Sequence, residues 1–169
     1  MIDIPKLETD RLALRQPSME DWPCFAELML SQRSVFMGGP FSTDRAWGAF
    51  CHGIAQWQLL GYGNLTMENR HNGQCLGQIE INHGPLFPEP ELGWQVYTFA
   101  EGKGYAYEAA MAMRQWAFEV RKLDTLVSYI DPENLRSRRL AERLGAKLDG
   151  NAVRQDPTDL VFRHPHLRQ

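Results

Sequence analysis

The residues of this sequence with the clearest chemical meaning are Gly102, Lys103 and Gly104. They lie between a β-prone segment and an alanine-rich segment that is predicted to be helical. The first turn of a helix has unpaired backbone N–H groups and the positive end of the helix dipole, so it attracts phosphate. Glycines keep that backbone accessible, and the lysine adds positive charge. The alternative is an ordinary strand-to-helix turn in which the glycines only allow tight bending.

Two common phosphate-binding loops do not fit this segment. A Walker loop needs Gly-Lys followed by Ser or Thr, whereas Gly104 follows Lys103 here. A dinucleotide fingerprint needs a third glycine and a preceding βαβ start, and both are missing. The segment therefore fits neither of these loops, and the phosphate binding predicted for it would belong to another structural setting.

A second group of chemically useful residues lies on a later predicted helix. Asn134 and Ser137 are three residues apart, so they share a helix face. Asn134 also follows Asp131-Pro132 and fits the N-cap position of this helix. Capping the helix is compatible with a second role for Asn134 as a chemically active side chain. No Cys–His pairing indicates a cysteine nucleophile. Cys24, Cys51 and Cys75 are interpreted as free thiols, and the histidine spacing predicts no metal site.

The elements that must position these residues follow from periodicity and turn signals. Helices are predicted from Ser18, with Asp21 as a capping partner, from Ser42 to about residue 60, over about 104–121 and over 134–144, where Gly145 is the cap. Strands are predicted over 12–14, 64–68, 74–82, 91–97, 125–130, 147–149 and 159–163. This order predicts one mixed α/β (α+β) domain spanning residues 1–169.

Composition narrows the function further. The chain has 169 residues, is 43% hydrophobic and carries a net charge of −3. These values are typical of a globular protein, and they give no basic field for nucleic acid. No segment is apolar enough to span a membrane, and Met1–Lys6 lacks a signal-peptide core. A cytoplasmic location is therefore expected.

Three motifs together resemble the GNAT superfamily of N-acetyltransferases, in particular its ribosomal-protein N-acetyltransferase branch. The family's cofactor motif, Gln/Arg-x-x-Gly-x-Gly/Ala, is similar to Glu101-Gly102-Lys103-Gly104-Tyr105-Ala106, which is followed by Glu108-Ala109. Leu7–Arg15 resembles the opening strand, and Gly145-Ala146 the closing motif. The match extends over nearly the whole chain. It departs at Glu101, where the family has Gln or Arg.

The resemblance implies a GNAT fold with a mostly antiparallel sheet of six or seven strands, a splayed strand pair and about four helices. It implies acetyl-CoA as cosubstrate, bound without metal. The implied coenzyme-binding residues are Gln95, Val96, Gly102, Lys103, Gly104, Tyr105, Ala106, Asn134 and Ser137. We expect Glu101 to face solvent, because a carboxylate beside a pyrophosphate is unfavourable. A basic helix face (Arg136, Arg138, Arg139, Arg143) either contacts the 3′-phosphate or is simply solvated.

The resemblance also implies direct attack of a primary amine on the thioester, with an acid and a base in the site. The family's usual tyrosine acid corresponds to Ala141, so Ser137 is its expected substitute. Glu91 is the first candidate for the base, with Glu80 and Asp156 as alternatives. The acceptor is expected to be a small-molecule amine or a protein N-terminus. Residues 37–42 and 82–90 are expected to select it. A catalytically inactive acyl-CoA sensor is the alternative function, and the oligomeric state, a homodimer included, stays open.

Overall fold

The computed structural model describes residues 3–166, and its central feature is a sheet of eight strands in the order β1-β2-β3-β4-β5-β6-β8-β7. The strands are β1 (Leu7–Glu8), β2 (Leu12–Arg15), β3 (Asn64–Asn69), β4 (Cys75–Asn82), β5 (Glu91–Val96), β6 (Val127–Ile130), β7 (Lys147–Leu148) and β8 (Leu160–Arg163). All neighbours pair antiparallel except β5 and β6, which are parallel. The predicted mixed fold with a mostly antiparallel sheet is confirmed.

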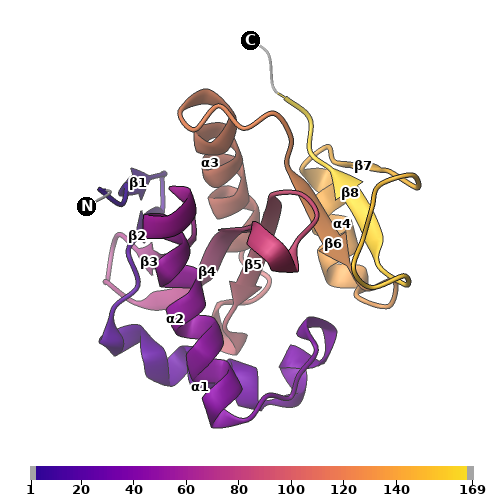
Figure 1. Cartoon of the computed structure of the whole chain (residues 1–169). Coiled ribbons are helices and arrows are strands. Elements are labelled where there is room, and N and C mark those ends of the chain that lie inside the picture. The colour runs from indigo at the N-terminus through magenta and orange to yellow at the C-terminus, as the bar shows by residue number, and fades with distance from the viewer. Residues whose placement is uncertain (1–2, 167–169) are drawn as a thin grey trace.

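Four α-helices accompany the sheet within the described residues, namely α1 (Trp22–Leu30), α2 (Thr43–Leu60), α3 (Tyr105–Glu119) and α4 (Leu135–Arg143). Short 3₁₀ segments are η1 (Met19–Asp21), η2 (Gln32–Met37), η3 (Gly84–Leu86) and η4 (Thr98–Ala100). In Figure 1, α1 and α2 form one side of the molecule, while α4 with β6, β7 and β8 forms the other. No helix in this part of the chain is both long and apolar enough to cross a bilayer.

The predicted elements differ from the structure at two places near the N-terminus. The chain after Ser18 first makes the 3₁₀ turn η1, and α1 begins only at Trp22. The Ser18 N–H donates to the Asp21 carboxylate over 2.9 Å, as the capping signal predicted. The eighth strand is β1, which reverses onto β2 through a tight turn in which the Thr9 N–H donates to the Leu12 carbonyl over 2.9 Å. Two residues are too few for a periodic signal, so β1 was not predicted as a separate strand, although it lies within the Leu7–Arg15 segment that resembles the family's opening strand.

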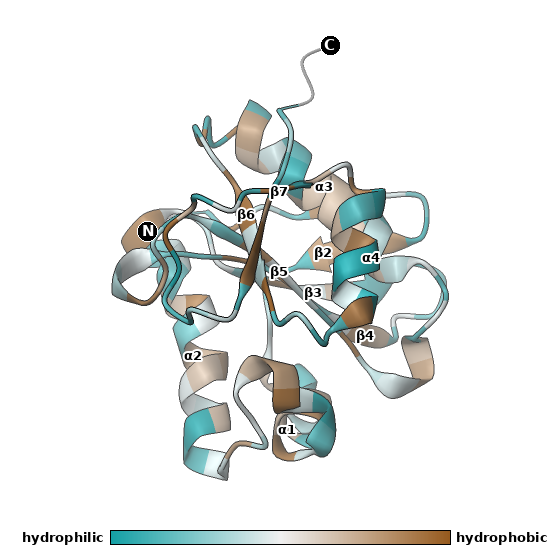
Figure 2. Ribbon diagram, turned by 90° about the vertical axis from the view of Figure 1, so that its right-hand side faces the viewer, coloured by the Kyte–Doolittle hydropathy of each residue, from teal (hydrophilic) through white to brown (hydrophobic). Residues whose placement is uncertain are grey.

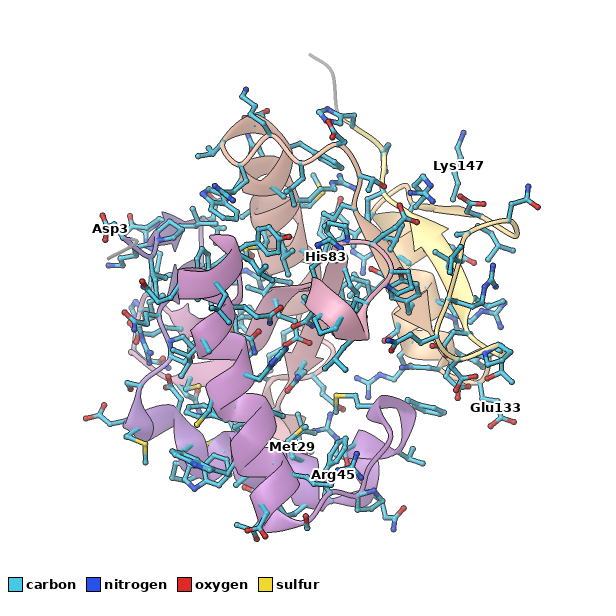
Figure 3. All side chains as sticks on the ribbon, viewed as in Figure 1. Asp3, Met29, Arg45, His83, Glu133 and Lys147 are labelled. Atoms are coloured by element: carbon cyan, nitrogen blue, oxygen red, sulfur yellow. The ribbon has the colours of Figure 1, made fainter. Side chains whose placement is uncertain are left out.

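Large apolar side chains hold α3 against the strands. Leu65, Ile79 and Leu92 from the sheet and Met113 from α3 are fully buried in one cluster. A second cluster joins α1 to α2, and Met29, labelled in Figure 3, belongs to it. The hydropathy colouring of Figure 2 shows that α4, by contrast, is largely hydrophilic. Its apolar side is limited to Leu140 and Ala141, which pack against the buried clusters.

Strands β5 and β6 separate after a single paired position. Glu91 is opposite Val127, and β5 then continues to Val96 with no further partner from β6. Ser128 on β6 reaches across this point, and its hydroxyl donates to the Leu92 carbonyl over 2.6 Å. The predicted splayed strand pair is therefore present.

Candidate active site

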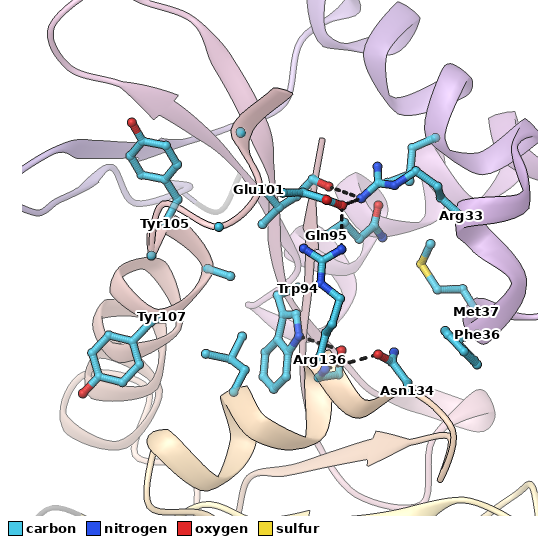
Figure 4. A pocket seen from close by; sticks show the side chains of 18 of the residues that line it. Arg33, Phe36, Met37, Trp94, Gln95, Glu101, Tyr105, Tyr107, Asn134 and Arg136 are labelled. Carbon is cyan, nitrogen blue, oxygen red and sulfur yellow. Dashed lines mark hydrogen bonds and ion pairs between the residues drawn. The ribbon is translucent and has the colours of Figure 1, made fainter. Parts of the chain in front are cut away.

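One pocket lies between α3, α4 and the free edge of β5, and we call it the α3–α4 pocket. Its volume is about 470 Å³. The residues that line it come from η2, β5, α3 and α4 and include Arg33, Trp94, Gln95, Val96, Glu101, Gly102, Gly104, Tyr105, Ala106, Asn134, Arg136, Ser137 and Arg143. Figure 4 shows several of these side chains converging on the pocket. It therefore collects nearly all of the residues proposed for coenzyme binding.

The N-terminus of α3 opens into this pocket without a side-chain cap. Gly104 occupies the N-cap position with φ 81°, and Gly102 has φ 72°, both in the left-handed region that glycine adopts readily. Ser42 and Asn134 cap α2 and α4 with their side chains, but glycine has none to offer. The first-turn N–H groups of α3 are thus left for an external acceptor. A Cβ atom built on Gly102 would meet nothing within 4 Å, so the approach to this turn is open.

Lys103 is the one predicted coenzyme residue that the structure does not bring into the α3–α4 pocket. Its ammonium group donates to the Phe99 carbonyl over 3.1 Å, and its side chain is exposed. Its own carbonyl accepts a hydrogen bond from Arg11 over 2.8 Å. The side chain turns away because a short-range carbonyl partner is available on the outer surface.

The expectation that Glu101 faces solvent is wrong. Its carboxylate lines the α3–α4 pocket and forms ion pairs with Arg33 from η2 and with Arg136 from α4. The Arg136–Glu101 distance is 3.0 Å. Arg33 also donates to the Val96 carbonyl over 3.1 Å. The two arginines compensate the negative charge for which an inward carboxylate was expected to be unfavourable. No local pattern in the sequence pairs residue 33 with residue 101.

The second pocket, which we call the α2 pocket, has a volume of about 790 Å³. It lies between α2, the ends of β4 and β5, β6 and the loops over residues 37–42 and 82–90. Its acidic lining residues are Glu80, Glu91, Asp131, Asp156 and Asp159, and among the described residues no lysine or arginine joins them. The apolar part of the wall includes Phe25, Met29, Phe41, Leu86 and Phe87.

The two pockets share part of their walls. Trp94, Gln95, Asn134 and Ser137 belong to both, together with residues of η2. Gln95 is 9% exposed, and its Oε1 atom is buried without a hydrogen-bond partner in the described structure. A buried amide oxygen without a partner is costly, so a donor from a bound molecule would stabilise it. This junction is where groups entering from the two sides would meet.

Ser137 and Asn134 are oriented by local hydrogen bonds at the junction. The Asn134 Oδ1 atom accepts the Ser137 backbone N–H over 3.2 Å, which confirms the predicted N-cap. The Trp94 indole N–H donates to the Ser137 hydroxyl over 3.2 Å. Since that hydroxyl oxygen is already an acceptor, its own proton is available to a further group. Ala141 is fully buried beside Ile130, Ala146 and Phe162, one helical turn beyond Ser137.

Glu91 has a strongly perturbed carboxyl group in the α2 pocket. Burial, followed by the neighbouring charge of Glu80, raises its pKa to about 8. The Asn82 amide donates to its Oε2 atom over 3.1 Å, and Gln56 in turn donates to Asn82 over 2.9 Å. Burial also raises the pKa of Glu80. A carboxyl group with a pKa near neutrality, held by an amide chain, is suited to accept a proton.

Asp156 is a weaker candidate for a base. Its carboxylate is exposed and accepts hydrogen bonds from the Thr158 N–H and hydroxyl over 2.9 and 2.7 Å. The pKa of Asp156 is lowered, chiefly by the hydroxyl bond. It lies at the mouth of the α2 pocket with its charge already satisfied. An exposed carboxylate with a low pKa has little driving force to take a proton.

The basic face of α4 divides into different roles. Arg136 and Arg143 line the α3–α4 pocket, and Arg143 lies 4.7 Å from the ring centre of Tyr107. Arg138 instead donates to the Pro132 carbonyl over 2.9 Å. Sequence reasoning missed Arg33, whose isolated position in η2 gave no signal. It also missed His164, which is buried and lies 2.9 Å from the Ser128 hydroxyl.

Comparison with known proteins defines the class to which this fold and site belong. The sequence matches the acetyltransferase (GNAT) domain over residues 11–147, and the chain therefore belongs to the GNAT acetyltransferases. It is 30% identical over 144 residues to the uncharacterised protein YkkB of Bacillus subtilis, covering 83% of this chain and 84% of that protein.

Solved structures agree with this assignment. A crystal structure of an acetyltransferase from Agrobacterium tumefaciens is 51% identical, with a TM-score of 0.95 and coverage of 98% of this chain and 97% of that one. A spermidine N-acetyltransferase from Vibrio cholerae, solved with CoA and spermine, has a TM-score of 0.72 over 92% of this chain and 94% of its own. At 15% identity, the latter likeness shows the fold alone.

Proposed function

We propose that this protein transfers an acetyl group from acetyl-CoA to a primary amine by direct attack within a ternary complex. The observation that carries the proposal is the meeting of two chemically different pockets at Trp94, Gln95, Asn134 and Ser137. One pocket presents helix N–H groups and arginines, and the other presents carboxylates. A phosphate-bearing thioester and a cationic amine therefore have separate entrances and a common meeting point. Holding two reactants in one geometry is itself a large part of catalysis.

The residues present fit coenzyme A in the α3–α4 pocket. The uncapped amides of Tyr105 and Ala106 suit a diphosphate, with the open turn at Gly102 giving access. The splayed edge of β5 offers the backbone N–H of Val96, next to the side chain of Gln95, to an extended amide-bearing arm, in the manner of an added strand. The unpartnered Gln95 side chain would gain a donor there. When bound, the coenzyme supplies the activated acetyl group.

We propose Glu91 as the base that removes the proton from the attacking amine. Its raised pKa lets it both accept a proton and release it to solvent within the normal pH range. The amide chain from Gln56 through Asn82 fixes the orientation of the carboxyl group. Glu80 lies beside it and contributes negative charge that favours proton uptake. Glu80 and Asp156 remain alternative candidates for the base. Asp156 is less suitable than Glu91, because its carboxylate is exposed and already accepts hydrogen bonds from Thr158.

We propose Ser137 as the group that stabilises the departing thiolate. The Trp94 indole occupies one lone pair of the hydroxyl oxygen and leaves the hydroxyl proton to point elsewhere. A hydroxyl proton directed at the sulfur lowers the barrier by opposing the charge that develops there. Ser137 then replaces the family's usual tyrosine acid, whose position is occupied by Ala141 in this chain.

Steady-state thiol release from acetyl-CoA tests this function with a panel of mono- and diamines and N-terminal peptides as acceptors. Release that depends on the amine, together with an acetylated product detected by mass spectrometry, is the expected result. Coenzyme binding by calorimetry without turnover on any amine would instead indicate an acyl-CoA sensor. Absence of coenzyme binding would contradict both functions.

A further inference from the structure

Glu101 is placed where a bound diphosphate would be expected to lie close to the protein. It directly precedes the Gly102–Gly104 turn, and its carboxylate lies in the α3–α4 pocket rather than on the surface. A single oxygen, Oε1, is shared by the guanidinium groups of Arg33 and Arg136. Figure 4 shows the three side chains meeting across the pocket from three separate elements.

This cluster has one positive charge more than it has negative charge. Two guanidinium groups face one carboxylate, and the pKa of Arg33 is lowered by burial and, to a lesser extent, by the positive charge of Arg136. The closest contact of each arginine is to the same carboxylate oxygen, Oε1. The two arginines thus form an anion site that one carboxylate fills incompletely and that a dianion would match better.

We propose that the Glu101 carboxylate occupies, in the free protein, the anion site that the coenzyme diphosphate takes on binding. Arg33 and Arg136 are then diphosphate-binding residues, and Glu101 is an internal competitor that must leave them. The inference rests on the proposed function, because that function assigns the coenzyme to this pocket. It also gives a role to the position at which the chain departs from the usual Gln or Arg.

The exchange is energetically accessible. The Arg136 side chain is 68% exposed and that of Arg33 34%, and ion pairs of this exposure contribute little to stability. A diphosphate offers several oxygens to planar guanidinium groups, which bind such groups in a bidentate manner. The displaced carboxylate stays tethered beside the uncapped turn of α3. Its repulsion of the diphosphate lowers the affinity unless it rotates toward water.

Calorimetric titration of coenzyme A into the whole protein tests the proposal. Glu101→Gln keeps the side-chain shape and removes the charge, so we expect it to bind coenzyme A about tenfold more tightly (~1.4 kcal/mol). Glu142→Gln is the matched control, since it makes the same charge change at an exposed position of α4 outside the pocket. Its affinity should equal that of the wild type. Arg33→Ala and Arg136→Ala should each weaken binding and reduce its dependence on salt.

Pantetheine separates this effect from a general change in the pocket, because it lacks the diphosphate. Glu101→Gln should leave inhibition by pantetheine unchanged. Unchanged or weaker coenzyme A binding by Glu101→Gln would overturn the proposal, as would wild-type affinity in the Arg33→Ala, Arg136→Ala double variant. Failure of the coenzyme assignment on which the proposal rests looks different, since the wild type and all variants would then fail to bind coenzyme A. Melting curves of each variant verify that it is folded.

Discussion

Among the individual residues, Glu91 shows most clearly how surroundings set chemistry. Its carboxyl group lies beside Glu80 and is held by Asn82, and its pKa is about 8. The pKa of Asp156, in the same pocket, is shifted in the opposite direction. Burial and like charge disfavour the ionised form of Glu91, while hydroxyl and amide donors favour that of Asp156. The two carboxyl groups are therefore suited to different roles.

Glu91 should control the acidic limb of the pH–rate profile. Because its pKa is raised, the proton-accepting carboxylate predominates only above about pH 8, and kcat/KM should rise with pH through that value. Glu91→Gln should lose this limb and about 10²-fold in kcat. Asp156→Asn, as a control, should keep the limb. Retention of the limb in Glu91→Gln and its loss in Glu80→Gln would transfer the role to Glu80.

Ala141 shows why the missing tyrosine cannot simply be restored. Its methyl group is fully buried against Ile130, Ala146 and Phe162. Ala141→Tyr should lower the free energy of unfolding by about 3 kcal/mol through overpacking and should not raise kcat. Urea denaturation and steady-state rates measure the two effects. A stable variant with faster turnover would show that the site can accommodate the tyrosine.

Residue types were easier to predict than side-chain directions. Asn134, Ser137 and the glycines at 102 and 104 were found because their roles depend on backbone position within a few residues. Lys103 was misplaced because its ammonium group bonds the nearby Phe99 carbonyl, and Glu101 was misplaced because its direction depends on partners far away in the sequence. For Glu101 these partners are Arg33, 68 residues away, and Arg136. Electrostatic pairing over such separations leaves no local pattern in one sequence.

At the level of elements, the divergence of β5 from β6 creates the site, and one side chain marks where it begins. The Ser128 hydroxyl donates to the Leu92 carbonyl and therefore accepts from His164 Nε2. This assigns the Nε2–H tautomer to His164, whose pKa is lowered to about 3 by burial and by Arg114. The neutral ring and the hydroxyl together join β6 and β8 to β5 at the point of separation.

Removal of this contact should weaken the sheet at the site. Ser128→Ala leaves the Leu92 carbonyl and the His164 N–H without their partner, at a cost of about 1–3 kcal/mol in the free energy of unfolding. We also expect a higher KM for acetyl-CoA, because β5 loses the hydrogen bond from Ser128 that holds its edge in place. Urea denaturation and steady-state kinetics give the two readouts. Ser128→Thr retains the hydroxyl and should recover most of the stability if the hydrogen bonds, rather than side-chain size, are responsible.

Most elements were predictable, because turn signals and apolar periodicity are local. The helix ends at Ser42, Asn134 and Gly145 agree with the structure since caps act within one turn. The order of strands in the sheet was not derivable from periodicity, and only the splayed strand pair was expected, from the family resemblance. The short strand β1 and the 3₁₀ turn η1 before α1 were not predicted as separate elements, because each is too short to show a periodic pattern of apolar residues.

For the molecule as a whole, charge is divided between the two pockets although the net charge is only −3. Arginines gather at the α3–α4 pocket and carboxylates at the α2 pocket. Each pocket therefore attracts a molecule of opposite sign. This arrangement reduces the chance that either molecule enters by the wrong side.

The acidic α2 pocket should favour acceptors with a second positive charge. We expect a linear diamine to have a kcat/KM about tenfold higher than a monoamine of equal length (~1.4 kcal/mol). The advantage should fall as salt rises, because exposed carboxylates such as Asp156 are screened. Thiol-release assays over a salt series measure it. A preference for the monoamine, or for an amino acid with a free carboxylate, would contradict the expected selection by charge.

The indole of Trp94 stands at the wall common to both pockets and donates to Ser137. The other tryptophans, at positions 22, 47, 57 and 116, lie outside both sets of lining residues. The protein therefore carries a built-in optical reporter. Its ultraviolet emission should respond to the arrival of either substrate through this single ring, so that the order of their arrival becomes readable by stopped-flow mixing without any dye.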